Sequence, residues 1–109
     1  APAAETKTAI DNFFRFIQLD PAVRKEFEEM ITTVGGRSPG WYSVSRAATH
    51  IRAQVLFLQD KDDLMTPISD VEPIMKKNYP NFRFVISEGL GHRRIYRDNH
   101  SFKEIMEFV

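Results

Sequence analysis

Two short apolar runs separated by one helical pattern constrain the fold of this chain more than any other feature. Residues 55–58 form a continuous apolar run, which is typical of a parallel strand buried on both faces. The run "FRFVIS" at residues 82–87 predicts a second strand. Between them, Thr66-Pro67 is expected to cap a helix that ends near residues 78–80. This order predicts a crossover between two parallel strands, and hence an α/β fold class.

The residues before position 54 carry helical periodicity instead. One apolar face follows the i, i+3, i+4 and i+7 spacing of a helix and consists of Ile10, Phe13, Phe14 and Ile17. Asp20-Pro21 supplies a cap and a proline at the first position of a second helix, which Gly35 is expected to end at C′. The apolar stripe of this second helix consists of Val23, Phe27, Met30, Ile31 and Val34.

Two further helices are expected. A short one has an apolar register made of Val44, Ala47, Ala48 and Ile51. The last helix has Asp98 or Ser101 as its candidate cap, and its apolar positions are Phe102, Ile105, Met106 and Val109. The predicted order is therefore three helices, a strand, a helix, a strand and a helix.

The composition limits the classes of protein that fit. A chain of 109 residues is one domain at most, and its 42% hydrophobic content suits a globular one. Fifteen basic and fifteen acidic residues cancel, so no charged stripe predicts binding to nucleic acid. The absence of cysteine excludes disulfides, thiolate nucleophiles and zinc-thiolate sites. No apolar run approaches the roughly 20 residues that span a bilayer, and no signal peptide is visible, so we expect a cytoplasmic protein without a membrane partner.

Both ends of the sequence have unusual features. The chain opens on "APAAE" without an initiator Met, and it stops at Phe108-Val109 inside an apolar pattern. These features favour a piece of a larger protein, although a processed terminus has the same appearance.

Functional groups in an open parallel sheet gather at the carboxyl ends of its strands. Asp60, Asp62 and Asp63 follow the first predicted strand, and a glycine-rich loop ending in His92 follows the second. The crossover brings both strand ends to one edge, where a carboxylate can orient an imidazole and stabilise its protonated form. The sequence therefore predicts a carboxylate–histidine pair. The same acidic cluster leaves a magnesium site open as an alternative.

The stretch "VLFLQDKDDLMTP" followed by "FRFVISEGLGHRRI" resembles the C-terminal segment of α/β-hydrolase fold enzymes. In that family the penultimate core strand runs into an acidic loop with a proline a few residues on, and the last strand runs into a glycine–histidine turn. The resemblance implies that Asp63, four residues before Pro67, is the triad acid and that His92 is the triad histidine. Asp60 stands where the family commonly has glycine, which leaves Asp62 as a rival acid. The "GLGHRRI" wording is similar to that of bacterial esterase-like hydrolases.

The resemblance covers residues 54–109 and implies a partial α/β-hydrolase fold, with the last two parallel core strands and their flanking helices. Residues 1–53 resemble the helical lid or connecting segments that such enzymes insert before the penultimate strand. We therefore expect two parts, a lid-like helical segment at 1–53 and a strand–helix–strand–helix segment at 54–109.

The stretch "GGRSPG" spells G-x-S-x-G around Ser38, which is the signature of a hydrolase nucleophile. Such a serine lies on a turn between a strand and a helix, whereas Ser38 follows an amphipathic helix. Pro39 has no backbone N–H, although the residue after the nucleophile normally donates one to the oxyanion. The other serines lack the flanking glycines and the setting: Ser43, Ser45, Ser69, Ser87 and Ser101. We interpret Ser38 as a decoy, so the chain has an acid and a base without their nucleophile.

These observations predict the C-terminal portion of a serine-type hydrolase that cleaves a small ester- or amide-containing molecule through an acyl-enzyme, without a metal or cofactor. His92 would be the general base and acid, and Asp63 its orienting partner. The chain alone is expected to be inactive and to self-associate, because two strands cannot cover the edges and faces that a full sheet covers. A non-catalytic binding or assembly domain of the same architecture is the alternative from a different class.

Overall fold

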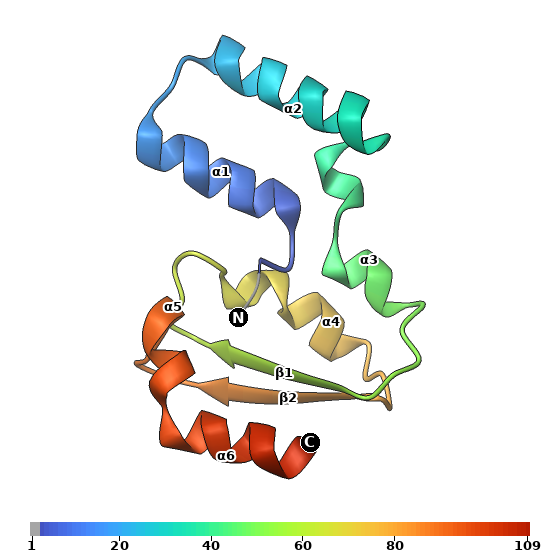
Figure 1. Cartoon of the computed structure of the whole chain (residues 1–109), viewed down its shortest axis with the longest axis vertical. Coiled ribbons are helices and arrows are strands. Elements are labelled where there is room, and N and C mark those ends of the chain that lie inside the picture. Colours follow the sequence, from blue (N-terminus) through green and yellow to red (C-terminus); the bar gives the residue numbers. More distant parts are fainter. Residues whose placement is uncertain (1–2) are drawn as a thin grey trace.

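The chain adopts a mixed α/β fold. The computed structural model describes residues 3–109, and over these residues six α-helices and three short 3-10 helices accompany a two-stranded parallel sheet (Figure 1). The α/β class predicted from the sequence is confirmed at this level. None of the helices in this part of the chain has both the length and the apolar character needed to cross a lipid bilayer.

The sheet consists of β1 (Val55–Asp60) and β2 (Phe82–Ser87), which pair in parallel. Both strands lie where the apolar runs predict them, and β1 continues two residues further, through Gln59 and Asp60. The register places Asp60 opposite Ser87. The two strands therefore end level, and the loops that follow them start side by side.

The core lies against one face of this sheet. Phe57 of β1 stacks on Phe84 of β2, with their ring centroids 5.7 Å apart. Ala4 and Val71, both buried, pack against Phe57, and the half-buried Val44 adds to the same cluster. The hydrophobic core therefore joins the strands both to the beginning of the chain and to the crossover segment.

The predicted crossover helix is split in two. η2 (Ile68–Asp70) is a single 3-10 turn, and α4 (Glu72–Lys76) is a short α-helix. Pro73 lies in the first turn of α4 and explains the break, because proline has no N–H to donate and its ring clashes with the carbonyl four residues back. The predicted cap at Thr66 is wrong, since the hydroxyl of Thr66 donates to the carboxylate of Asp63 instead of capping a helix.

The helices α1 (Thr6–Ile17) and α2 (Pro21–Gly35) form a hairpin at the positions predicted for them. Asp20 caps α2 by accepting a hydrogen bond of 2.8 Å from a backbone N–H in its first turn. The predicted end of α2 is wrong by one residue. Gly35 is still helical, and Gly36, with a φ of 80°, takes the left-handed position. Because both residues are glycine, the helix can extend by one residue without backbone strain.

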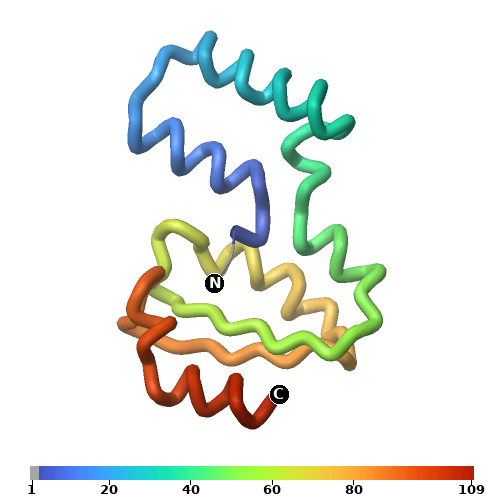
Figure 2. Tube along the Cα trace, in the orientation of Figure 1, coloured from blue at the N-terminus to red at the C-terminus, as the bar shows by residue number. Residues whose placement is uncertain are grey.

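A short neck ties this helical hairpin to the rest of the molecule. Glu5 and Ser43 form an antiparallel bridge, and the N–H of Val44 donates to the carbonyl of Ala4 at 2.8 Å. Figure 2 shows the chain leaving toward α1 and returning toward the third helix at neighbouring points. The two ends of the hairpin are therefore held together beside the core.

The remaining elements are short or terminal. Asp98 caps the last helix, because its carboxylate accepts a 2.8 Å hydrogen bond from the N–H of Ser101, and this confirms one of the two predicted caps. Figure 1 shows this last helix and α4 on opposite sides of the strands. The bounds are η1 (Pro39–Trp41), α3 (Val44–Ala48), α5 (Gly91–Arg94), η3 (Ile95–Arg97) and α6 (Asn99–Phe108).

The chain is more open than a compact protein of its size. Its radius of gyration is 15.7 Å, against about 13 Å for a compact domain of this length. Its accessible surface is 7839 Å², whereas a typical monomer of this mass exposes about 6,200 Å². No residue of α2 is buried anywhere along that helix. Large apolar side chains of the α1–α2 hairpin and of α6 are exposed, namely Phe13, Phe16, Val23, Phe27, Met30, Val34, Phe102, Ile105, Met106 and Phe108.

Candidate active site

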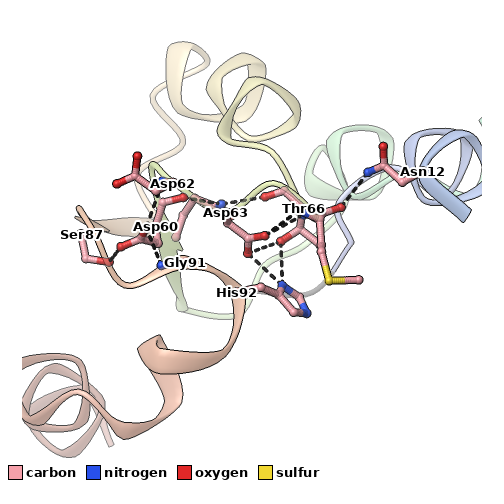
Figure 3. Close-up of polar contacts among 10 residues, drawn as sticks. Asn12, Asp60, Asp62, Asp63, Thr66, Ser87, Gly91 and His92 are labelled. Atoms are coloured by element: carbon pink, nitrogen blue, oxygen red, sulfur yellow. Dashed lines mark hydrogen bonds and ion pairs between the residues drawn. The ribbon is translucent and has the colours of Figure 1, made fainter. Parts of the chain in front are cut away.

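A carboxylate and an imidazole meet at the carboxyl edge of the sheet. Asp63 lies in the loop after β1, and His92 lies in α5, which follows the loop after β2. Nδ1 of His92 is 2.9 Å from Oδ2 of Asp63 (Figure 3). Residues 29 positions apart meet because the two strands end level. The structure thus brings together the two residues that the sequence singles out.

The carboxylate of Asp63 is buried and fully hydrogen-bonded. It is 2% exposed, and its Oδ2 accepts a hydrogen bond of 2.6 Å from the hydroxyl of Thr66. Its Oδ1 accepts hydrogen bonds of 2.9 Å from the N–H groups of Met65 and Thr66. Burial raises the pKa of Asp63, but the hydrogen bonds from Thr66, His92 and Met65 lower it by more, so the pKa lies below its ordinary value. Asp63 is therefore ionised at neutral pH.

An ionised Asp63 determines the tautomer of His92. A carboxylate can only accept hydrogen bonds, so the ring nitrogen that faces it, Nδ1, carries the proton. Nε2 then keeps its lone pair, and Figure 3 shows this second nitrogen on the side of the ring away from Asp63. The His92 side chain is 30% exposed. The arrangement therefore presents a basic nitrogen, oriented by a buried anion, at a partly open surface.

Asp62, the rival acid, has a different partner. Its Oδ2 accepts a hydrogen bond of 2.6 Å from the N–H of Gly89, in the loop after β2. This contact holds Asp62 on the glycine loop and leaves Asp63 as the carboxylate that pairs with His92.

Asp60 has a role that sequence reasoning missed. It is 1% exposed, and its two oxygens accept hydrogen bonds from four donors, which are the hydroxyl of Ser87 and the N–H groups of Asp62, Leu90 and Gly91. Burial raises the pKa of Asp60, but the hydrogen bonds, led by that of Ser87, lower it by more, so its pKa also lies below the ordinary value. The sequence contains one signal of this role, which is an acidic residue at the end of a strand that is otherwise mostly apolar.

The loop that carries Asp63 is held from two sides. From the sheet, the amide of the buried Gln59 donates to the carbonyls of Asp60 and Thr66, at 3.0 and 2.8 Å. From the helical hairpin, Asn12 of α1 donates to the carbonyl of Met65 at 3.0 Å (Figure 3). The hairpin therefore touches the site through α1, a contact without any signal in the sequence.

The acidic cluster does not form a set of metal ligands. Among residues 3–109, no three His, Asp or Glu side chains are placed to hold a metal ion. The physical reason is that the oxygens of Asp60 and Asp63 already accept hydrogen bonds from N–H and O–H groups. The magnesium alternative therefore has no ligand cluster in this part of the chain.

Ser38 does not lie in the setting of a nucleophile. It precedes the 3-10 turn that begins at Pro39, and no strand leads into it. Figure 1 shows this connection beside the end of α2, far from α5. Several other serine hydroxyls donate to carboxylates, with Ser43 bound to Glu5, Ser87 to Asp60 and Ser101 to Asp98.

Comparisons of this chain with family models, curated proteins and solved structures found no match. The class of site is therefore inferred from its own residues and geometry.

Proposed function

We propose that this chain carries the acid and the base of a hydrolytic active site. One observation supports this most strongly: a buried, ionised Asp63 receives Nδ1–H of the partly exposed His92 at the carboxyl edge of a parallel sheet. In acyl-transfer enzymes such a pair orients the imidazole and stabilises the imidazolium formed during the reaction. The class proposed is thus a hydrolase that works by general base and general acid catalysis.

The chemistry follows from the tautomer. Nε2 of His92 takes the proton of an attacking hydroxyl, whose oxygen bonds to the carbonyl carbon of the substrate. The imidazolium, stabilised by Asp63, then returns this proton to the departing alcohol or amine as the carbonyl re-forms. A water molecule, deprotonated by the same nitrogen, then bonds to the acyl carbon, and the imidazolium returns the proton to the hydroxyl oxygen as its bond to the acyl group breaks. His92 is the general base and acid, and Asp63 is its positioning partner.

More particularly, we propose a serine-type α/β hydrolase that acts on a small ester-like molecule, with this chain as its C-terminal portion. The support is the order of strand, acidic loop, helix, strand and glycine–histidine turn, together with the resemblance of residues 54–109. Asp60 departs from the family pattern, but it does not disturb the pairing of Asp63 with His92.

The nucleophile of this proposal lies outside these residues. Ser38 has neither the strand before it nor the N–H after it that the role needs. The exposed apolar faces of α2 and α6 suit a segment that packs against further parts of a larger sheet protein. A non-catalytic module of the same architecture is the second candidate, and the absence of a suitable serine in this chain favours it.

Covalent labelling separates the two candidates. A fluorophosphonate probe is applied to the complete gene product that contains this chain, and the labelled residue is mapped. We expect a serine outside these 109 residues to be labelled, and His92→Ala to slow labelling by several orders of magnitude, up to about 10⁶-fold. His100→Ala, at an exposed histidine of α6, is the matched control and should leave labelling unchanged. Labelling of Ser38, labelling that survives His92→Ala, or no labelling at all would contradict the proposal.

A further inference from the structure

We propose that Asp60 is a positioning residue for His92, because its buried carboxylate holds the loop between β2 and α5 in the one shape that presents the imidazole to Asp63. The functional meaning of this role rests on the proposed function of His92 as the base. The hydrogen bonds that support this role lie within the chain and do not depend on the proposed function.

The carboxylate of Asp60 holds the end of β2, the loop itself and the start of α5 at once. Oδ2 accepts from the hydroxyl of Ser87 at 2.6 Å and from the N–H of Leu90 at 3.1 Å. Oδ1 accepts from the N–H of Gly91 at 2.9 Å. Gly91 directly precedes His92, so this last hydrogen bond fixes the backbone next to the imidazole. Asp60 therefore acts on His92 through the chain and not through the ring.

Asp60 also joins this loop to the loop that carries the acid. Its Oδ1 accepts a second hydrogen bond, of 2.9 Å, from the N–H of Asp62, the residue before Asp63. One side chain thus sets the backbone on both sides of the pair, next to Asp63 and next to His92. This is why the two partners approach within hydrogen-bond distance although they belong to different loops.

The negative charge is necessary for this arrangement. All four groups around Asp60 donate hydrogen bonds, and only a carboxylate has oxygens on both of its arms to accept them. An asparagine of the same shape would place an NH₂ group against two donors. The Ser87 hydroxyl can turn and accept from that NH₂ group, but a backbone N–H cannot, so either the N–H of Leu90 or those of Asp62 and Gly91 would lose their acceptor, which is unfavourable.

The opposite side of the loop is held by a cation. Arg94 donates from Nε to the carbonyl of Leu90 at 3.0 Å and from Nη2 to the carbonyl of Gly89 at 2.8 Å. Gly89 and Gly91 have φ angles of 75° and 67°, which side-chain-bearing residues rarely adopt. The loop therefore turns its N–H groups toward Asp60 and Asp62, and its carbonyls toward Arg94.

The test uses NMR of this chain and needs neither a nucleophile nor a substrate. In the unmodified chain, the amides of Leu90 and Gly91 should exchange slowly with solvent, and His92 should give an Nδ1–H signal. In Asp60→Asn, exchange of at least one of these two amides, the one that faces the NH₂ group, should rise about tenfold or more and the Nδ1–H signal should be lost, while β1 and β2 amides stay protected. Ser87→Ala is the matched control, because it removes one donor and leaves both loop amides bonded to Asp60.

Two results would overturn this role for Asp60. One is fast exchange of the Leu90 and Gly91 amides in the unmodified chain, which is measurable even where Asp60→Asn does not fold. The other is a folded Asp60→Asn chain that keeps the Nδ1–H signal of His92. Both are independent of the labelling experiment, so failure of the hydrolase proposal and failure of this inference are distinguishable.

Discussion

Oδ2 of Asp63 lies 2.9 Å from Nδ1 of His92, and the two side chains come from loops that follow different strands. This contact depends on the parallel register in which Asp60 lies opposite Ser87, because that register makes both strands end at the same level. A buried anion and a partly exposed imidazole are thereby combined at one edge of a two-stranded sheet.

Thr66 should stabilise the acid of the pair. Its hydroxyl donates to Asp63 Oδ2 at 2.6 Å, and both groups are buried. Thr66→Val leaves that oxygen with one donor fewer and should lower the free energy of unfolding by about 1–3 kcal/mol. Thr66→Ser keeps the hydroxyl and is the matched control. Urea denaturation of the two variants measures the difference, and equal stabilities would show that this hydrogen bond contributes nothing.

The stability of the chain should fall in acid because of two buried carboxylates. The pKa values of Asp60 and Asp63 lie below the ordinary 3.8 in the folded chain. A depressed pKa in the folded state contributes stability above the pKa of the unfolded state, and this stability is lost as the pH falls through the folded pKa. Melting temperatures measured from pH 7 downward should therefore be level at first and drop as the pH passes below about 4. Asp63→Asn removes one of the two groups and should flatten this drop; an unchanged slope would refute the contribution of Asp63.

The exposed apolar face of the helical hairpin should cause self-association. Val34 of α2 is 83% exposed and Phe16 of α1 is 88% exposed. Many large apolar side chains of α1 and α2 are exposed in this way, and exposed apolar surface favours association between molecules. Light scattering of the isolated chain should detect oligomers, and Val34→Glu or Phe16→Glu should shift them toward monomer.

Thr33→Glu supplies the control for this surface. It adds the same charge to an exposed neighbouring position of α2 without removing an apolar side chain. It should leave the oligomers in place. A clean monomer of the unmodified chain at high concentration would contradict the prediction. If Thr33→Glu dissociated the oligomers as much as Val34→Glu does, the added charge and not the lost apolar side chain would be the cause.

Gly36 should be difficult to replace, whereas Gly40 should not. Gly36 ends α2 with a φ of 80°, a conformation that costs an L-residue about 1 kcal/mol. Gly40 lies in the next turn without a positive φ, and a Cβ there would meet nothing within 4 Å. Gly36→Ala should therefore lower the melting temperature by about 4 °C or more. Gly40→Ala should leave it nearly unchanged, and a comparable loss in both variants would show that the left-handed turn is not the cause.

The helix caps at Asp20 and Asp98 are predicted correctly from the sequence, whereas the continuous helix through Pro73 is not. Asp20 and Asp98 act on backbone groups two or three residues away, so their signal is entirely local. Pro73 is also a local signal, and a continuous helix through it was wrong because its missing N–H outweighs the apolar periodicity around it. At Gly35 and Gly36 both residues can adopt the left-handed conformation, so the sequence could not distinguish which would end the helix.

The sequence by itself determined the positions of both strands, the helical first half and the carboxyl-edge placement of an acid and a histidine. These depend on apolar periodicity and on strand order, which neighbouring residues encode. Only the tertiary structure decided that Asp63 and not Asp62 meets His92, and that Asp60 holds both loops. Such contacts depend on the register of β1 against β2 and on loop shapes that join residues about thirty positions apart. The exposure of the apolar stripe of α2 is also visible only in the tertiary structure, because helical spacing predicts an apolar face but does not specify which surface covers it.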